Sequence, residues 1–185
     1  MPIHQNSTVA TNKLLIGNCK IETSASAGGT YVNLGAGIVS TSAHEVERYA
    51  VQAGNAPDPL EGVSDETIKV DFEMIEYDSS VLAAIHGGLI ASTTTSSVQT
   101  IHAGGNSTIT PRAFRLTNTR YISGTTVQTI LTVYNATMDT GPSITWKSDN
   151  DTDPIAVLPG SFTGKLDDTR TVGYQLYMLT HDVLA

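Results

Sequence analysis

The feature that most constrains this fold is a strict alternation of polar and apolar side chains over residues 67–74. The apolar members are Ile68, Val70, Phe72 and Met74. The polar members are Thr67, Lys69, Asp71 and Glu73. Because successive side chains of a β-strand point to opposite faces of the sheet, a period of two predicts a strand with one buried and one solvated face. The segment is therefore expected to belong to a sheet that packs on one side.

Further runs of β-branched and aromatic residues predict more strands. They cover residues 14–23, 43–53, 98–103, 113–119, 126–137, 143–148, 155–165 and 174–180. The chain has 26 threonines, whose branched Cβ packs well on a pleated sheet. Many short strands separated by turn residues predict an antiparallel β-sandwich or barrel. Without an internal repeat or linker, we expect one domain over residues 14–185, preceded by a flexible N-terminal arm over residues 1–13.

Three segments are expected to differ from this strand pattern. A short helix is predicted from Asp78, which can cap the first turn, to Gly87 and Gly88, which can end it in a left-handed conformation. Residues 31–39 contain two glycines and are predicted to wind rather than to pair. Residues 91–97 form a Ser/Thr run that is too polar for a core.

The charge balance and the cysteine content argue against several classes of protein. The chain has 10 Lys and Arg against 18 Asp and Glu, a net charge of −8. A protein that grips nucleic acid needs clustered cations, so this class is not expected. No stretch approaches about 18 uninterrupted apolar residues, so we expect no membrane span. A single cysteine, Cys19, and the lack of a visible secretory signal favour an intracellular place of folding.

We expect no catalytic residues, cofactor or metal. The histidines have no ligand spacing, and no G-x-S-x-G nucleophile elbow is present. The acidic run at residues 149–153 begins like a calcium loop, but it lacks the required glycine and glutamate, which favours an ordinary turn. One enzymatic alternative is a glycosidase pair formed by Asp71 and Glu73, about 7 Å apart on one strand face. A solvated strand face is the simpler interpretation.

Several segments, taken in order, carry a resemblance to a known family. They are residues 67–78 with the predicted helix after them, 131–137, 144–154, 161–167 and 175–177. Over residues 14–180 this order resembles the tail tube proteins, or major tail proteins, of tailed bacteriophages. The resemblance lies in the order of elements and a few short phrases rather than in one motif.

The resemblance implies a structural virion protein. Six subunits would form a ring, and rings would stack into a hollow tail tube through which DNA passes without specific binding. It implies the tape-measure protein and other tail proteins as partners. It also implies a location in the phage tail after assembly in the cytoplasm of the host bacterium.

Two candidate sites follow from this interpretation. The polar face of Thr67, Lys69, Asp71 and Glu73 is a candidate wall of the tube, and we expect the lumen to carry more acids than bases, because clustered cations would hold the DNA. The second site is the loop at residues 54–62, a candidate contact between rings. Its candidate residues are Asn55, Pro57, Asp58, Pro59 and Glu61.

An alternative of a different class is a monomeric β-sandwich binding module, such as a phage decoration or adhesin domain. It predicts a monomer with a ligand patch, whereas the tube subunit predicts rings that form as the concentration rises.

Overall fold

The protein is mainly β, as the sequence predicts. The computed structural model describes residues 18–51, 60–74, 90–95, 98–104, 109–122, 124–139 and 158–184, and no helix lies in these ranges. The strands are β1 (Asn18–Ser24), β2 (Val32–Val51), β3 (Leu60–Met74), β4 (Ile90–Thr95), β5 (Val98–Ala103), β6 (Arg112–Ile122), β7 (Thr125–Met138), β8 (Leu158–Lys165) and β9 (Tyr177–Leu184). The predicted N-terminal arm at residues 1–13, the predicted helix at 78–88 and the predicted strand at 143–148 lie outside the described residues.

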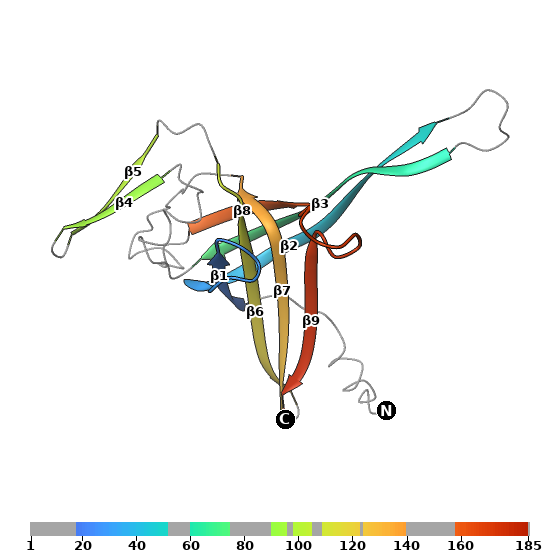
Figure 1. Ribbon diagram of the computed structural model, residues 1–185. Coiled ribbons are helices and arrows are strands. Elements are labelled where there is room, and N and C mark those ends of the chain that lie inside the picture. The colour runs from blue at the N-terminus through green and yellow to red at the C-terminus, as the bar shows by residue number, and fades with distance from the viewer. Residues whose placement is uncertain are drawn as a thin grey trace, which may run out of the picture.

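Seven strands form one antiparallel sheet in the order β6-β1-β2-β3-β8-β7-β9 (Figure 1). β6 also pairs with β7, so the six strands β6, β1, β2, β3, β8 and β7 form a closed circuit of paired strands. β9 pairs with β7 beside this circuit. β4 and β5 form a separate two-stranded sheet.

The core is built on the inner face of these strands. All three phenylalanines of the chain are buried in it. Phe114 stacks on Phe162 with ring centroids 4.4 Å apart, and Phe72 lies 6.0 Å from Phe162. Gly160 permits this packing, because a Cβ there would lie 2.5 Å from the ring of Phe72.

The strict alternation at residues 67–74 is confirmed in β3. Its apolar side chains are at most 3 % exposed, whereas Lys69 and Glu73 are exposed and Thr67 and Asp71 are half-buried. The buried face belongs to the core that contains the phenylalanines. The other face is the polar face that the sequence predicts.

One prediction about local structure is wrong. Residues 32–38 do not wind but pair with β1, because glycine accommodates a β-bulge there: Gly35 has a φ of 141°, beside a register shift between Ile21 and Glu22. Gly37 lets the strands approach, since a Cβ there would lie 2.8 Å from the carbonyl oxygen of Glu73. The Ser/Thr run, which the sequence indicates is too polar for a core, contributes strand β4, which pairs with β5 rather than with the core sheet.

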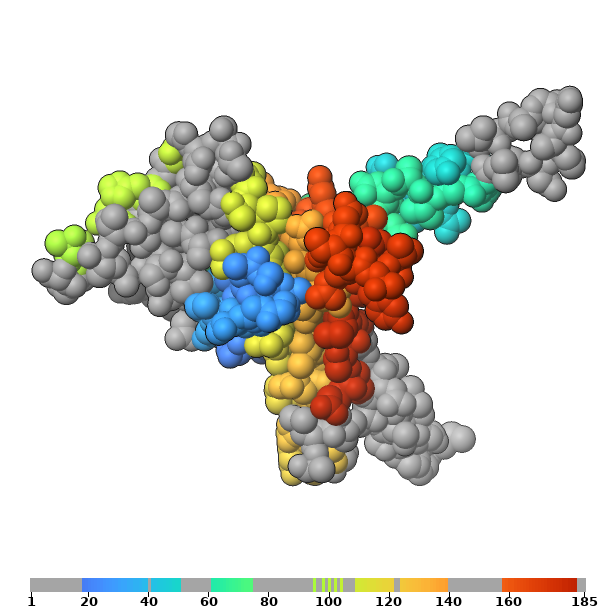
Figure 2. Space-filling model, in the orientation of Figure 1, coloured from blue at the N-terminus to red at the C-terminus, as the bar shows by residue number. Residues whose placement is uncertain are grey.

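A hairpin formed by β2 and β3 reaches beyond the sheet (Figures 1 and 2). The pairing of β1 with β2 ends at Ile38, and the pairing of β8 with β3 begins at Thr67. Residues 46–51 and 60–66 pair with each other and, in the described part of the chain, with no third strand. We call these two segments the hairpin extension. β3 begins at Leu60, so the predicted loop at residues 54–62 is shorter at its C-terminal end than expected.

Candidate functional site

The candidate polar face lies at the centre of a wider surface. Antiparallel partners place their side chains on the same face of a sheet. On β2, Thr41, Ala43 and Glu45 lie opposite Asp71, Lys69 and Thr67, in that order. On β8, Ser161, Thr163 and Lys165 lie opposite the same three residues. The polar face of β3 therefore continues over both neighbouring strands.

This surface is acidic. Its carboxylates are those of Glu45, Glu47, Asp65, Asp71, Glu73 and Asp139, and its ammonium groups are those of Lys69 and Lys165. Asp139 follows β7 and joins the surface through its carboxylate, whose Oδ2 accepts hydrogen bonds from Ser161 at 3.0 Å and Thr163 at 2.8 Å. We call this set of eight residues with Thr67 the acidic face.

The hairpin extension carries the acidic face away from the core. Glu47 lies directly opposite Asp65, so two carboxylates face each other across the two strands. Apolar side chains are also exposed there: Val46, Tyr49 and Val63 are 40 %, 51 % and 49 % exposed. The extension thus combines like charges, exposed apolar groups and open strand edges.

The root of the extension contacts the last strand. The ring of His44 meets the ring of Tyr177 edge to face at a centroid distance of 5.6 Å, and His44 Nε2 lies 3.6 Å from Glu66 Oε2. These contacts fix where the extension leaves the sheet.

The structure describes one of the five candidate residues of the predicted inter-ring loop. Glu61 is exposed and lies in β3, within the extension. Asn55, Pro57, Asp58 and Pro59 lie outside the described residues. The described strands on either side of these residues end at Val51 and begin at Leu60, which pair with each other.

Sequence reasoning missed Glu45, Glu47 and Asp65 as members of the acidic face. Their signal is present in the sequence, because Glu45 and Glu47 alternate with Val46 in a segment predicted as a strand. Assigning them to the same face as Asp71 required the register between β2 and β3, which the sequence does not give.

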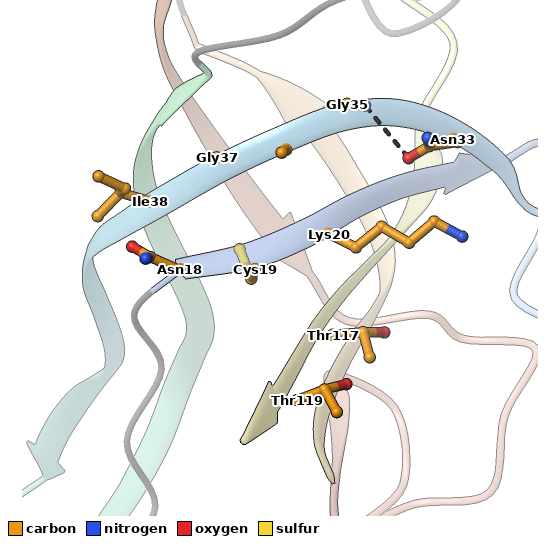
Figure 3. A pocket seen from close by; sticks show the side chains of 10 residues that line it. Asn18, Cys19, Lys20, Asn33, Gly35, Gly37, Ile38, Thr117 and Thr119 are labelled. Atoms are coloured by element: carbon orange, nitrogen blue, oxygen red, sulfur yellow. Dashed lines mark hydrogen bonds between the residues drawn. The ribbon is translucent and has the colours of Figure 1, made fainter. Parts of the chain in front are cut away.

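A separate hollow of about 510 Å³ lies over β1, β2 and β6 (Figure 3). Its lining includes Lys20, Asn33, Ile38, Thr117 and Thr119. Residues 35–37 of β2, which are Gly, Ala and Gly, form part of its lining. Neither Asp71 nor Glu73 lines this hollow.

The thiol of Cys19, at the wall of this hollow, is suited to packing rather than to chemistry. Cys19 is buried. Burial raises its pKa to about 11, against a smaller lowering by a hydrogen bond with the backbone of Val39. Because the thiolate is the nucleophilic form, a thiol that stays protonated near neutral pH is inert.

A buried carboxylate stands next to the hollow. Glu22 is 6 % exposed and is held by Lys20 Nζ at 2.7 Å and Arg115 Nε at 2.8 Å. Burial opposes its ionisation, but these hydrogen bonds outweigh burial and hold the pKa of the Glu22 carboxyl below its usual value. Arg115 also lies 4.1 Å from the centre of the Tyr31 ring, which fastens the β1–β2 turn to β6.

A matching contact fastens the segment between β8 and β9. The guanidinium of Arg170 lies 3.5 Å from the centre of the Tyr134 ring and 3.5 Å from Asp167 Oδ2. The backbone N–H of Tyr134 donates to the carbonyl oxygen of Leu176. The contact of Arg115 with Tyr31 and the contact of Arg170 with Tyr134 therefore hold neighbouring segments against β6 and β7.

The described ranges contain no group of three or more His, Cys, Asp or Glu that could hold a metal ion. No helix among the described residues is long and apolar enough to cross a membrane. In comparisons with known proteins, no family model matches this chain and no curated protein matches it.

Proposed function

We propose that this chain is the structural subunit of a bacteriophage tail tube. Six copies form a ring, rings stack into a hollow tube, and the tube conducts DNA from the virion into the host. The tape-measure protein and other tail proteins are its further partners, and assembly takes place in the host bacterial cytoplasm. The protein performs no chemistry, because its mechanism is polymerisation around a channel that does not retain DNA.

The strand pairing supports a core suited to such a subunit. The order β6-β1-β2-β3-β8-β7 returns to β6 and surrounds the buried phenylalanines, which fits a barrel or a sandwich closed at both sides. Such a core has few open edges of its own. Contacts between subunits then depend on the elements that project from it.

The observation that carries the proposal is the hairpin extension. A two-stranded hairpin is marginally stable at best in water, and like charges directly opposite each other weaken it further. The extension has both properties, since Glu47 faces Asp65 and its two outer edges are unpaired in the described structure. A neighbouring subunit that pairs with these edges and buries Tyr49 would stabilise it.

The acidic face suits the wall of a DNA channel. Duplex DNA has one negative charge per roughly 1.7 Å of its length, and neutralising 6–10 phosphates is enough to hold it. On the acidic face, carboxylates outnumber the ammonium groups of Lys69 and Lys165. A channel wall of this composition repels the phosphate backbone and lets the DNA duplex pass.

The direct test is negative-stain electron microscopy of the concentrated protein, with light scattering after size-exclusion chromatography. We expect rings or tubes with a channel wide enough for a duplex of about 20 Å. An assembled form without a channel would contradict the proposal. A monomer at every concentration would also count against it unless isolated phage tail tips nucleate polymerisation.

A second candidate function is a monomeric binding module, such as a phage decoration or adhesin domain. The hollow of about 510 Å³ over β1, β2 and β6 favours it, because that volume is typical of a small-ligand site. Saturable ligand binding by a stable monomer, lost on Thr117→Arg, would support this candidate over the tube.

A further inference from the structure

The hollow over β1, β2 and β6 is built on rows of side chains that share one face of the sheet (Figure 3). Antiparallel partners place their side chains on the same face. In the middle row, Lys20 of β1 lies between Ala36 of β2 and Thr117 of β6. Larger side chains stand at the two ends of the hollow, Asn18 and Ile38 at one end and Asn33 at the other. Lys20 is thus flanked by short side chains and is open to a ligand.

The charges around the hollow are positive, although the chain has a net charge of −8. Among the ten described residues that line the hollow, none is Asp or Glu, and Lys20 contributes an ammonium group. The adjacent carboxylate of Glu22 is bound to both Lys20 and Arg115, so these groups carry two positive charges against one negative. The side chain of Lys20 is 52 % exposed and that of Glu22 is 7 % exposed, so a ligand meets the ammonium group. Because an ammonium group has three donors, Lys20 can hold Glu22 and a single negative group of a ligand together.

The other polar groups of the hollow suit a ligand that has several hydroxyl groups. They are the amide and hydroxyl side chains of Asn18, Asn33, Thr117 and Thr119. Each of them can both donate and accept hydrogen bonds, as the hydroxyl groups of a sugar do. Asn33 is held in place, because its Oδ1 accepts a hydrogen bond from the backbone N–H of Gly35 at 3.3 Å. Ile38, which is 42 % exposed, offers an apolar surface to the C–H groups of a sugar ring.

Other classes of anionic ligand fit these groups less well. The described lining contains no aromatic ring on which a base could stack, and Ile38 is its one large apolar side chain, which is too little for a fatty acid. A peptide that adds a strand needs a free sheet edge, whereas β1 pairs with β2 on one side and with β6 on the other. A phosphate group is recognised best by arginine forks or by successive backbone N–H groups. A carboxylate needs only the single ammonium group that lines the hollow.

We propose that this hollow binds a sugar that carries a carboxylate, such as a uronic acid. The carboxylate lies at Lys20, and the sugar hydroxyl groups contact the amide and hydroxyl side chains around it. The volume of about 510 Å³ is within the range of small-ligand sites. The proposal goes beyond the tube, because the hollow lies within one copy and binding needs no assembly. It rests on the binding role that the second candidate function gives this hollow, and it adds the class of ligand.

Saturation-transfer difference NMR tests the site, because it detects weak ligands on a monomer and on an assembly alike. The probes are glucuronic acid, glucose as its uncharged counterpart and phosphorylated glucose as the counterpart that carries a phosphate. We expect glucuronic acid to bind saturably and about tenfold more tightly than glucose, because a hydrogen bond to a charged group is stronger than a neutral one. Phosphorylated glucose should bind no more tightly than glucuronic acid.

Three variants locate the binding. Lys20→Gln removes the charge but keeps a group that can donate to Glu22, and it should lower the affinity for glucuronic acid to that for glucose. Lys165→Gln makes the same change in net charge at an exposed position outside the hollow, and it should bind glucuronic acid as the wild type does. Ala36→Leu fills the hollow without a change of charge and should remove the binding of both sugars.

The outcomes separate this site from the proposed functions. The site is overturned if the wild type shows no saturable binding of glucuronic acid, galacturonic acid or N-acetylneuraminic acid, or if Lys20→Gln binds glucuronic acid as tightly as the wild type. Rings and tubes that form without sugar binding would leave the tube intact, and saturable binding of another ligand in the hollow would leave the second candidate function intact. If the variants misfold, as judged by circular dichroism, the wild type decides: equal binding of glucuronic acid and glucose overturns the site.

Discussion

At the scale of single residues, Glu22 shows how a buried charge is kept in this fold. A carboxylate that is 6 % exposed would be destabilising without partners, and Lys20 and Arg115 supply two charge-assisted hydrogen bonds. Arg115 in turn covers the Tyr31 ring. Loss of the carboxylate therefore weakens both the β1–β6 pairing and the turn that follows β1.

We predict that Glu22→Gln lowers the free energy of unfolding by about 2 kcal/mol at pH 7. The folded-state pKa of Glu22 is below its unfolded value, so this stabilisation is complete above the unfolded pKa and is lost as the pH falls through the folded one. The difference between wild type and variant, measured by urea unfolding, should shrink as the pH falls below about 4.5. Glu73→Gln, on the exposed face, is the control and should change the free energy of unfolding little. If Glu22→Gln lowered this free energy equally at pH 7 and pH 3, the result would contradict a stabilising ion pair at Glu22.

A second residue-scale prediction concerns Gly164 in β8. A Cβ at this position would collide with Cγ1 of Val133 and would lie 2.8 Å from Cγ2 of Ile68. Gly164→Ala should therefore destabilise the protein by about 1–3 kcal/mol through overpacking, measured as a lower midpoint of urea unfolding.

Gly28→Ala is the matched control, because no atom lies within 4 Å of the added Cβ and little effect is expected. The double variant Gly164→Ala with Val133→Ala should be less destabilised than the sum of its single variants. Strict additivity would show that Val133 is not the source of the strain.

At the scale of elements, the strands with a clear period were predictable from the sequence. β3 is the best case, because each polar residue of its alternation faces outward and each apolar one is buried. β5, β6, β7 and β8 also fall within or close to the predicted ranges. In these segments local pattern and tertiary packing favour the same structure.

The segments that were mispredicted depend on contacts that a local pattern does not contain. Residues 35–37 look like a turn, but Gly35 serves a β-bulge and Gly37 serves a close strand contact. β4 has no apolar period, because it pairs outside the core. Likewise, Asp71 and Glu73 were identified from their own strand, whereas Glu47 and Asp139 join the face through register and hydrogen bonds from other strands.

An element-scale prediction follows for the hairpin extension. Replacing residues 46–66 with Asn-Gly leaves Glu45 and Thr67, a native cross-strand pair, joined by a two-residue turn. We expect the thermal midpoint to change little, because the described side chains of residues 46–50 and 61–66 are largely exposed, while rings and tubes disappear in electron micrographs. Tubes that form as in the wild type would show that the extension is not the assembly element.

At the scale of the whole molecule, charge is segregated between surfaces. The acidic face and the extension hold much of the described negative charge, the β4–β5 hairpin holds none, and the cations near Glu22 are engaged with it or with tyrosine rings. In a tube, the part of the acidic face over residues 67–73 and β8 would repel DNA, whereas the hairpin extension would contact other subunits.

The last prediction tests the acidic face as the channel wall. Glu45→Lys together with Glu73→Lys should leave tubes assembled but make them retain duplex DNA, measured by co-sedimentation at low salt. Retention should fall steeply as salt rises, because each neutralised phosphate releases counterions.

The control is Asp168→Lys with Asp182→Lys, which makes the same change in net charge at exposed positions away from the acidic face. If the acidic face lines the channel, DNA inside the tube contacts every ring of Glu45→Lys and Glu73→Lys subunits, so retention in that variant should exceed that of the control at equal salt. Equal retention by the two variants would mean that net charge alone governs DNA contact and that the acidic face lies elsewhere than the lumen.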